Sequence, residues 1–143
     1  LKDFFVNNML QELVVRILQT NVRQSYTEET LILKSGNRLA YIIQFIRAHL
    51  HEPLTIEKLS EKACMSQSHF FRVFKQEMGV SPLDFILAER IRRAVELLSK
   101  PGMSIKEVYM DCGFESRSYF NRVFKHHKQV SPSAFQRQAR CSN

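Results

Sequence analysis

The feature that most constrains the fold is a direct repeat with a period of about fifty residues. The stretch HFFRVFKQEMGVSP at 69–82 returns as YFNRVFKHHKQVSP at 119–132. The upstream flanks correspond as well, with Met65 pairing with Phe114, before one extra residue shifts the register. Because the flanks match along with the repeat, one structural unit is used twice, and two copies are too few for a solenoid.

Apolar residues recur at helical spacing along most of the chain, and no segment shows the alternation of a strand. Each repeated unit has the pattern of a short helix, a tight turn and a longer helix. We therefore predict an all-α fold with about seven helices after Gly36. Its first helix-turn-helix unit spans about 55–79, a long linker helix about 82–98, and the second helix-turn-helix unit about 104–128.

Capping residues sharpen the expected helix ends. Met65 and Phe70 are placed to form a hydrophobic staple around a serine cap, and Gly79 is a natural stop. The sequence Ser35–Asn37 predicts a break between a helix over 26–34 and a helix whose apolar stripe begins at Leu39. The expected N-cap residues are Thr55, Ser66, Ser81, Ser104 (in a capping box with Glu107) and Ser131.

The charge is concentrated in the repeated region. Residues 1–36 contain four basic and four acidic residues, whereas the rest contains seventeen and ten, which is the whole net charge of +7. A basic module indicates a polyanionic partner, either nucleic acid or an acidic membrane surface, or else only a soluble basic surface. No apolar run approaches the roughly 18 residues that would span a bilayer, so we expect no membrane segment.

The two longer repeat helices share one further pattern. One face of each is apolar, and the opposite face carries hydrogen-bonding and cationic side chains with no acidic residue. Arg can bridge a guanine edge, Asn or Gln an adenine edge, and Lys can neutralise a phosphate, so this face suits a DNA major groove. A solvated face is the alternative, but it usually mixes charges. The stripes are Gln67, Ser68, Phe71, Arg72 and Lys75, and Arg117, Ser118, Asn121, Arg122 and Lys125.

The linker helix sets the distance between these faces. A helix over 82–98 is about 25 Å long at about 1.5 Å per residue. With the width of each unit added, the faces would lie about 34 Å apart, which is one turn of duplex DNA. Because the units are direct repeats with different polar residues, the bound site should be asymmetric and not palindromic.

Three stretches carry a family resemblance: RIRRAVELL at 90–98, IKEVYMDCGFESRSYFNRVFK at 105–125 and VSPSAF at 130–135. Over about Asn37–Arg137 the chain resembles the DNA-binding domain of the AraC/XylS family of bacterial transcription regulators. The resemblance implies a seven-helix, homeodomain-like tandem of two helix-turn-helix units whose recognition helices enter successive major grooves. It implies regulation of transcription, usually activation, through contact with RNA polymerase. We further expect a cytoplasmic protein with no cofactor, metal or catalytic residue.

The resemblance also places contacts with double-stranded DNA. Adding Gln67 from the polar stripe, the expected base contacts are Gln67, Ser68, Phe71, Arg72, Arg117, Ser118, Tyr119, Asn121 and Arg122. The expected phosphate contacts are Lys75 and Lys125, together with the helix N-termini near Ser66 and Ser116.

The N-terminal segment is expected to be separate. In family terms, residues 1–36 resemble the end of an upstream effector or dimerisation domain plus a linker, and residues 37–143 form the DNA-binding domain. The leading Leu indicates a piece of a longer protein. An apolar stripe at Phe5, Met9, Leu13, Val14 and Ile17 must pack somewhere. It can pack against the DNA-binding domain or against a second copy of the chain. The second case would give a homodimer through residues 1–35. A missing N-terminal domain is the other expected route to a homodimer.

The chain departs from the family pattern at three positions. Tyr109 replaces the usual Ala at a close helix crossing, and its bulk can widen the crossing or turn outward. Gln129 replaces the usual Gly, so it either accepts a positive φ with some strain or ends the helix differently. Phe71 stands where a polar base reader is common, and can contact a thymine methyl group or simply pack.

Other reactive residues are weighed against plainer interpretations. Adjacent histidines at 126–127 point to different helix faces, so we expect no metal site. Three cysteines without CxxC spacing indicate reduced thiols, with Cys64 and Cys112 packed in the core. Arginines 90, 92 and 93 can contact phosphate, polymerase or solvent.

Two rival functions stay open. One is a helical protein-interaction module. The other is a DNA-repair fusion with a reactive cysteine, which would need a base beside the thiol.

Overall fold

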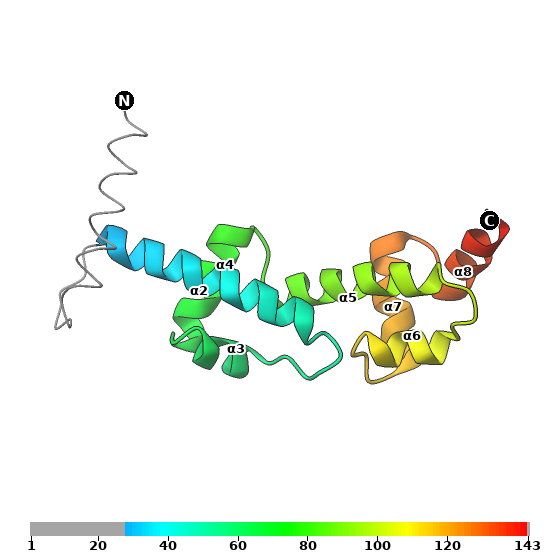
Figure 1. The fold of residues 1–143 in the computed structure, drawn as a ribbon, viewed down its shortest axis with the longest axis horizontal. Helices are drawn as coiled ribbons and strands as arrows, with labels where there is room; N and C mark the ends of the chain where they lie inside the picture. Colours follow the sequence, from blue (N-terminus) through cyan, green and yellow to red (C-terminus); the bar gives the residue numbers. More distant parts are fainter. Residues whose placement is uncertain (1–27, 143) are drawn as a thin grey trace, which may run out of the picture. The chain divides into compact units, whose positions relative to one another are not determined.

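The computed structural model describes residues 28–142, which form seven helices and no strand. The expected helix over 3–20 lies outside these residues. In chain order the helices are α2 (Glu28–Ala48), α3 (Ile56–Lys62), α4 (Gln67–Met78), α5 (Pro82–Leu98), α6 (Ile105–Asp111), α7 (Arg117–Lys128) and α8 (Pro132–Cys141) (Figure 1). The predicted all-α class and the tandem of two helix-turn-helix units are therefore confirmed: α3–α4 form the first unit and α6–α7 the second.

Contacts divide the chain into a unit of residues 1–37 and a compact unit of residues 38–143. The division falls inside α2, close to the predicted domain boundary, whose functional meaning stays a prediction. The unit of residues 38–143 carries both helix-turn-helix units, and the description below concerns it alone.

This unit contains two separate buried clusters. The first is built on Ile42 and Ile46 of α2 with Phe70 and Phe74 of α4, and the second on Phe120 and Phe124 of α7 with residues of α6. Helix α5 runs between the two groups of helices and contributes to both (Figure 1). Its share of the first cluster is Phe85 and Ile86, and its share of the second is Ile91, Ala94 and Leu98.

The predicted helix caps are confirmed. In each case a side-chain oxygen accepts a hydrogen bond from a backbone N–H of the first turn, a contact that contributes about 1 kcal/mol to helix stability. Ser104 and Glu107 form the reciprocal capping box. The accepted bonds come from the N–H of Lys58 to Thr55 (3.1 Å), His69 to Ser66 (3.2 Å), Asp84 to Ser81 (3.1 Å), Glu107 to Ser104 (3.2 Å) and Ala134 to Ser131 (3.1 Å).

The predicted break at Ser35–Asn37 is wrong. Helix α2 continues from Glu28 to Ala48 through Gly36 without interruption. A single glycine inside a helix costs about 1 kcal/mol relative to alanine, which is too little to stop a helix whose hydrogen bonds continue on both sides. Gly36 would mark the end of a helix only if a new helix began with its own N-cap directly after it, and α2 instead continues through this position.

Gln129 takes the left-handed conformation that the family position requires. Its φ is 64°, close to the φ of 75° at Gly79, the equivalent residue of the first unit. Both end their helices in the same way, because the N–H of Gln129 donates to Lys125 O at 2.8 Å and that of Gly79 to Lys75 O at 2.9 Å. The alternative of a different helix end is therefore wrong, and Gln129 carries backbone strain.

The prediction that Cys64 and Cys112 both pack in the core is correct for one of them. Cys112 is fully buried, but Cys64 is exposed and has a φ of 54°. The correspondence of Met65 with Phe114 places Cys64 opposite Gly113, which also has a positive φ, so the residue that truly matches Cys112 is the buried Ala63. Cys64 lies two residues beyond the end of α3 at Lys62. Helical periodicity does not extend to it, so the pattern could not reveal that it is a turn residue.

Replacing Gln129 by Gly should stabilise the protein. An L-residue in the left-handed region costs about 1–2 kcal/mol, and the extra freedom of Gly in the unfolded chain offsets part of the gain. We expect the free energy of unfolding, measured with urea, to rise by about 0.5–1 kcal/mol. Lys128→Gly, one residue earlier and still helical, is the control and should lower it by about 0.5–1 kcal/mol. Equal effects of the two substitutions would contradict the strain at Gln129.

Candidate nucleic-acid interface

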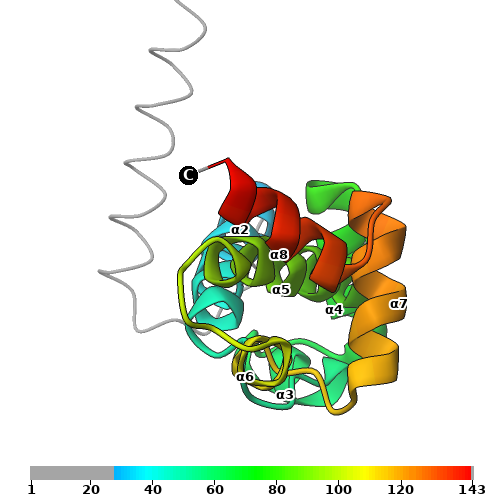
Figure 2. The same cartoon turned by 90° about the vertical axis from the view of Figure 1, so that its right-hand side faces the viewer.

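Helices α4 and α7 lie on the same side of the unit of residues 38–143 (Figure 2). They also run in the same direction, upward in the view of Figure 1. Phe70 and Phe74 anchor the inner face of α4, and Phe120 and Phe124 anchor the same positions of α7. Packing of these phenylalanines turns the polar stripe of each helix outward.

The side chains predicted to contact DNA are accessible. Tyr119 is half-buried, and every other predicted contact residue is exposed. A duplex can therefore reach these side chains without any rearrangement of the two buried clusters. The exposed ones are Ser66, Gln67, Ser68, Phe71, Arg72, Lys75, Ser116, Arg117, Ser118, Asn121, Arg122 and Lys125.

The cations on the polar stripes form no ion pair with any acidic residue that the structure describes. Helix α7 has four Lys or Arg residues and no Asp or Glu. Several arginines elsewhere in the unit, in contrast, are held by carboxylates. Cations without a carboxylate partner on one side of a protein are available to phosphates and base edges. The stripe cations are Arg72, Lys75, Arg117, Arg122 and Lys125.

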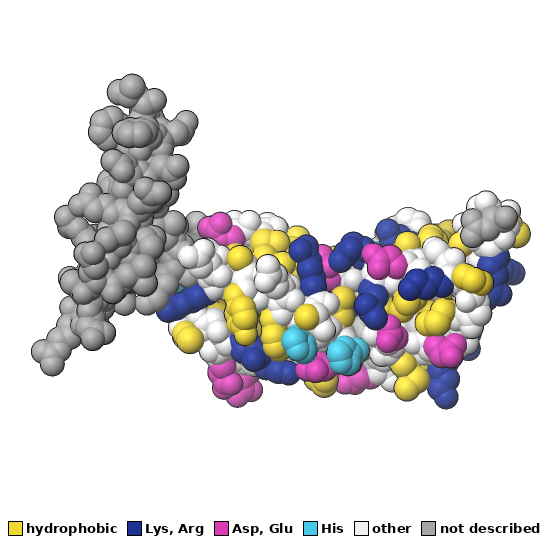
Figure 3. Space-filling model, in the orientation of Figure 1, with side chains coloured by type: hydrophobic (Ala, Val, Ile, Leu, Met, Phe, Trp, Pro, Cys, Tyr) yellow, Lys and Arg dark blue, Asp and Glu magenta, His cyan; other side chains and the backbone are white. Residues whose placement is uncertain are grey.

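The opposite face has a different character. In Figure 3, where α2, α5 and α6 lie in front, Lys and Arg side chains alternate with Asp and Glu. Three arginines on this part of the unit are held in ion pairs: Arg47 and Arg92 with Glu89 at 3.3 and 2.9 Å, and Arg93 with Asp111 at 2.7 Å. Mixed charge of this kind is typical of a solvated surface.

Local contacts orient the two arginines at equivalent positions. Arg72 donates to His69 Nδ1 at 3.1 Å. The guanidinium of Arg122 lies 5.2 Å from the ring centroid of Tyr119, which packs edge-on against Phe114. Tyr119 is thus half-buried because its ring joins the second cluster, and it supports Arg122 through a cation–π contact.

Two departures from the family pattern can now be placed. Phe71 is 42% exposed, so this large ring stands on the outward face of α4 and not in the core. Tyr109 is half-buried, with its ring 6.1 Å from that of Phe120, and packs at the edge of the second cluster.

The three linker arginines are already engaged within the protein. Arg92 pairs with Glu89 and Glu96, and Arg93 with Asp111. Burial alone would raise the pKa of Glu89, but hydrogen bonds from Arg92 and Arg47 outweigh burial and hold that pKa below its ordinary value. Arg90 donates to two backbone carbonyls, and burial lowers its pKa. Sequence alone left these roles open because the partners of Arg90 and Arg93 are distant along the chain.

Comparison with known proteins decides the family. A family model described as a helix-turn-helix domain matches residues 59–138, which is more than half of the chain. The arabinose operon regulatory protein of Escherichia coli (strain K12) is 33% identical over 129 residues, covering 90% of this chain and 42% of that protein. The chain belongs to the AraC/XylS family.

Solved structures agree with this assignment. The DNA-binding domain of AdpA, in complex with a target DNA, is 31% identical with a TM-score of 0.72, covering 74% of this chain and 96% of that chain. An AraC-type transcriptional regulator from Chromobacterium violaceum is 28% identical with a TM-score of 0.67, covering 73% and 94%. The chain therefore contains an AraC-type helix-turn-helix DNA-binding domain.

The chain spans only part of its curated relatives. It covers 45%, 55% and 40% of three regulators from Haemophilus influenzae, Photobacterium leiognathi and Pseudomonas aeruginosa. The AraC/XylS match thus concerns the DNA-binding domain. No described helix is long and apolar enough to cross a membrane, and the described residues include no cluster of three potential metal ligands.

The buried thiol of this AraC/XylS domain should be unreactive. Burial raises the pKa of Cys112 to about 12, so its thiol stays protonated at about pH 8. We expect a chromogenic disulfide reagent to label Cys64 and Cys141 in the native protein and Cys112 only after denaturation. The Cys64→Ser/Cys141→Ser variant is the control, and rapid native labelling of that variant would contradict the prediction and favour a reactive cysteine.

Proposed function

We propose that this chain is the sequence-specific, double-stranded DNA-binding part of a bacterial transcription regulator, with α4 and α7 entering successive major grooves. One observation carries the proposal: two outward helix faces, whose cations pair with no described carboxylate, lie on the same side of one unit and are joined by α5. Helix α5 has 17 residues, about 25 Å at about 1.5 Å per residue, which suits recognition helices about one duplex turn apart.

The proposed contacts follow the chemistry of each face. Arg72 and Arg122 suit guanine, Asn121 suits adenine, and Phe71 suits a thymine methyl group. Lys75 and Lys125 suit phosphate, as do the helix N-termini at the two serine caps. The remaining proposed base contacts are Gln67, Ser68, Arg117, Ser118 and Tyr119.

The role of the whole protein extends beyond this domain. We propose that it regulates transcription through RNA polymerase, as an activator, and has no enzymatic activity; its curated relatives include a protein named as a transcriptional regulator and one named as an operon regulatory protein. The apolar stripe within residues 1–35 supports a homodimer. Sedimentation masses that correspond to a monomer, both for the full chain and for the chain without residues 1–35, would remove that proposal.

Selection from a random duplex pool tests the proposed function directly. The full chain should enrich sequences with two preferred patches about one helical turn apart. The patches should differ from each other, because α4 and α7 carry different side chains. Enrichment of no sequence would contradict specific binding and favour a protein-interaction module.

Two neighbouring residues of α7 should separate base reading from phosphate binding. Arg122→Ala should weaken binding to the selected duplex by about 1–3 kcal/mol and relax preference at one or two base pairs. Lys125→Ala, the matched control, should weaken all duplexes alike and reduce the salt dependence of log K by about one unit of slope. Titrations at several salt concentrations measure both effects, and unchanged selectivity of Arg122→Ala would count against a base contact.

A further inference from the structure

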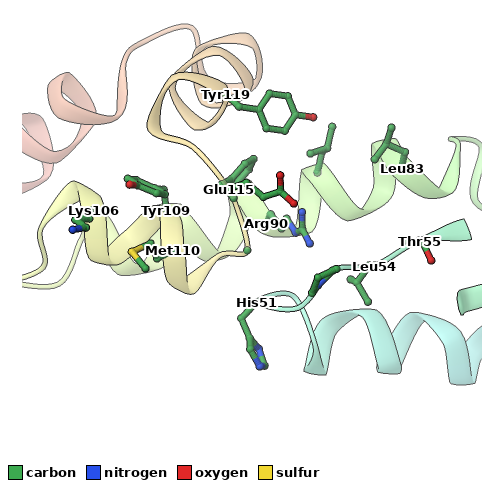
Figure 4. A pocket seen from close by; sticks show the side chains of 14 residues that line it. His51, Leu54, Thr55, Leu83, Arg90, Lys106, Tyr109, Met110, Glu115 and Tyr119 are labelled. Atoms are coloured by element: carbon green, nitrogen blue, oxygen red, sulfur yellow. The ribbon is translucent and has the colours of Figure 1, made fainter.

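The first half of the unit (α2, α3 and α4) and the second half (α6, α7 and α8) meet at few places besides α5. The two buried clusters share no residue, and α5 alone among the described helices supplies buried side chains to both. A groove of about 760 Å³ lies between the halves, lined by Leu83, Leu87, Tyr109 and Met110 among others (Figure 4). Because the groove separates the halves, α5 by itself would leave their relative rotation weakly constrained.

Arg90 bridges the halves beside this groove. From α5 it donates Nε–H to Leu50 O at 3.1 Å and Nη2–H to Glu52 O at 2.9 Å, both in the segment after α2. Its guanidinium lies 5.9 Å from the ring centroid of Phe114, in the turn of the second unit. Figure 4 shows Arg90 extending toward the segment that carries His51 and Leu54. One side chain therefore joins the linker helix to both halves.

Gly113 completes this contact by having no side chain. A Cβ at Gly113 would overlap the carbonyl oxygen of Leu50 and lie 3.1 Å from the Arg90 guanidinium. The equivalent residue of the first unit, Cys64, has a positive φ and still carries a side chain, which is exposed. The turn itself thus tolerates a side chain, and it is the close approach of Leu50 that excludes one at Gly113.

We propose that the contact of Arg90 and Gly113 with Leu50 and Glu52, the inter-unit clasp, fixes the rotation of α7 relative to α4 and thereby determines the base-pair spacing that the protein accepts. The part concerning DNA rests on the proposed function. Inserting one base pair rotates a half-site by about 34° and shifts it by about 3.4 Å. A fixed pair of helices cannot follow that change, whereas a loosely joined pair can.

The clasp can be tested without DNA. Spin labels on Gln76→Cys and Lys128→Cys, in a Cys64→Ser/Cys141→Ser background of the full chain, report the distance between α4 and α7. Adding Arg90→Met should broaden the distance distribution. Arg93→Met is the matched control, since Arg93 also lies on α5 but its ion pair joins α5 to Asp111 of the second half only, and it should leave the distribution narrow. An Arg90→Met distribution as narrow as that of the parent would overturn the proposal.

The consequence for recognition is measured on a duplex selected by the unmodified chain, with one base pair inserted or deleted between its patches. The unmodified chain and Arg93→Met should lose at least about tenfold in affinity, whereas Arg90→Met should lose clearly less. A broadened distance with an unchanged spacing preference would overturn the role in specificity. If selection returns no preferred duplex, the proposed function fails, while the label distances still decide whether the clasp exists.

A second variant guards against unfolding. Arg90→Lys keeps a positive charge but cannot donate the bidentate pair of hydrogen bonds to the carbonyl oxygens of Leu50 and Glu52. Should circular dichroism show Arg90→Met unfolded, Arg90→Lys must show the broader distance distribution and the relaxed spacing preference. Behaviour of Arg90→Lys identical to that of the unmodified chain would then overturn the proposal.

Discussion

Sharing of one helix between two cores is the constraint on which the rest of the structure depends. Phe85 and Ile86 of α5 belong to the first buried cluster, and Ile91, Ala94 and Leu98 to the second. Each half therefore needs α5 to complete its core, and neither can shift along α5 without exposing apolar surface. The same packing turns the polar face of α4 away from the first cluster and that of α7 away from the second, so the outward orientation of each face follows from the composition of its own core.

Local features were predictable from the sequence because their causes are local. The serine and threonine caps, the capping box at Ser104 and the inward phenylalanines depend on residues within one or two helical turns. The polar stripes of α4 and α7 were predictable for the same reason, since helical periodicity decides which side chains share a face. Their function as DNA contacts remains a prediction.

The failures have a different physical origin. The supposed break at Ser35–Asn37 rested on glycine propensity, which is weak compared with a continuing helix. Cys64 was assigned to the core although it is the turn residue opposite Gly113. The roles of Arg90 and Arg93 could not be read from the sequence, because their partners lie 38 to 40 and 18 positions away. Contacts of that range depend on how the halves assemble.

The difference between Cys64 and Gly113 means that the two copies are no longer interchangeable. An exchange of the two turns would place a side chain against the Leu50 carbonyl oxygen, where none fits. The order of the units along the chain is therefore fixed by sterics as well as by connectivity. A duplex held by α4 and α7 would therefore be bound in one orientation only. The protein would then always present the same side to a protein bound at the adjacent DNA.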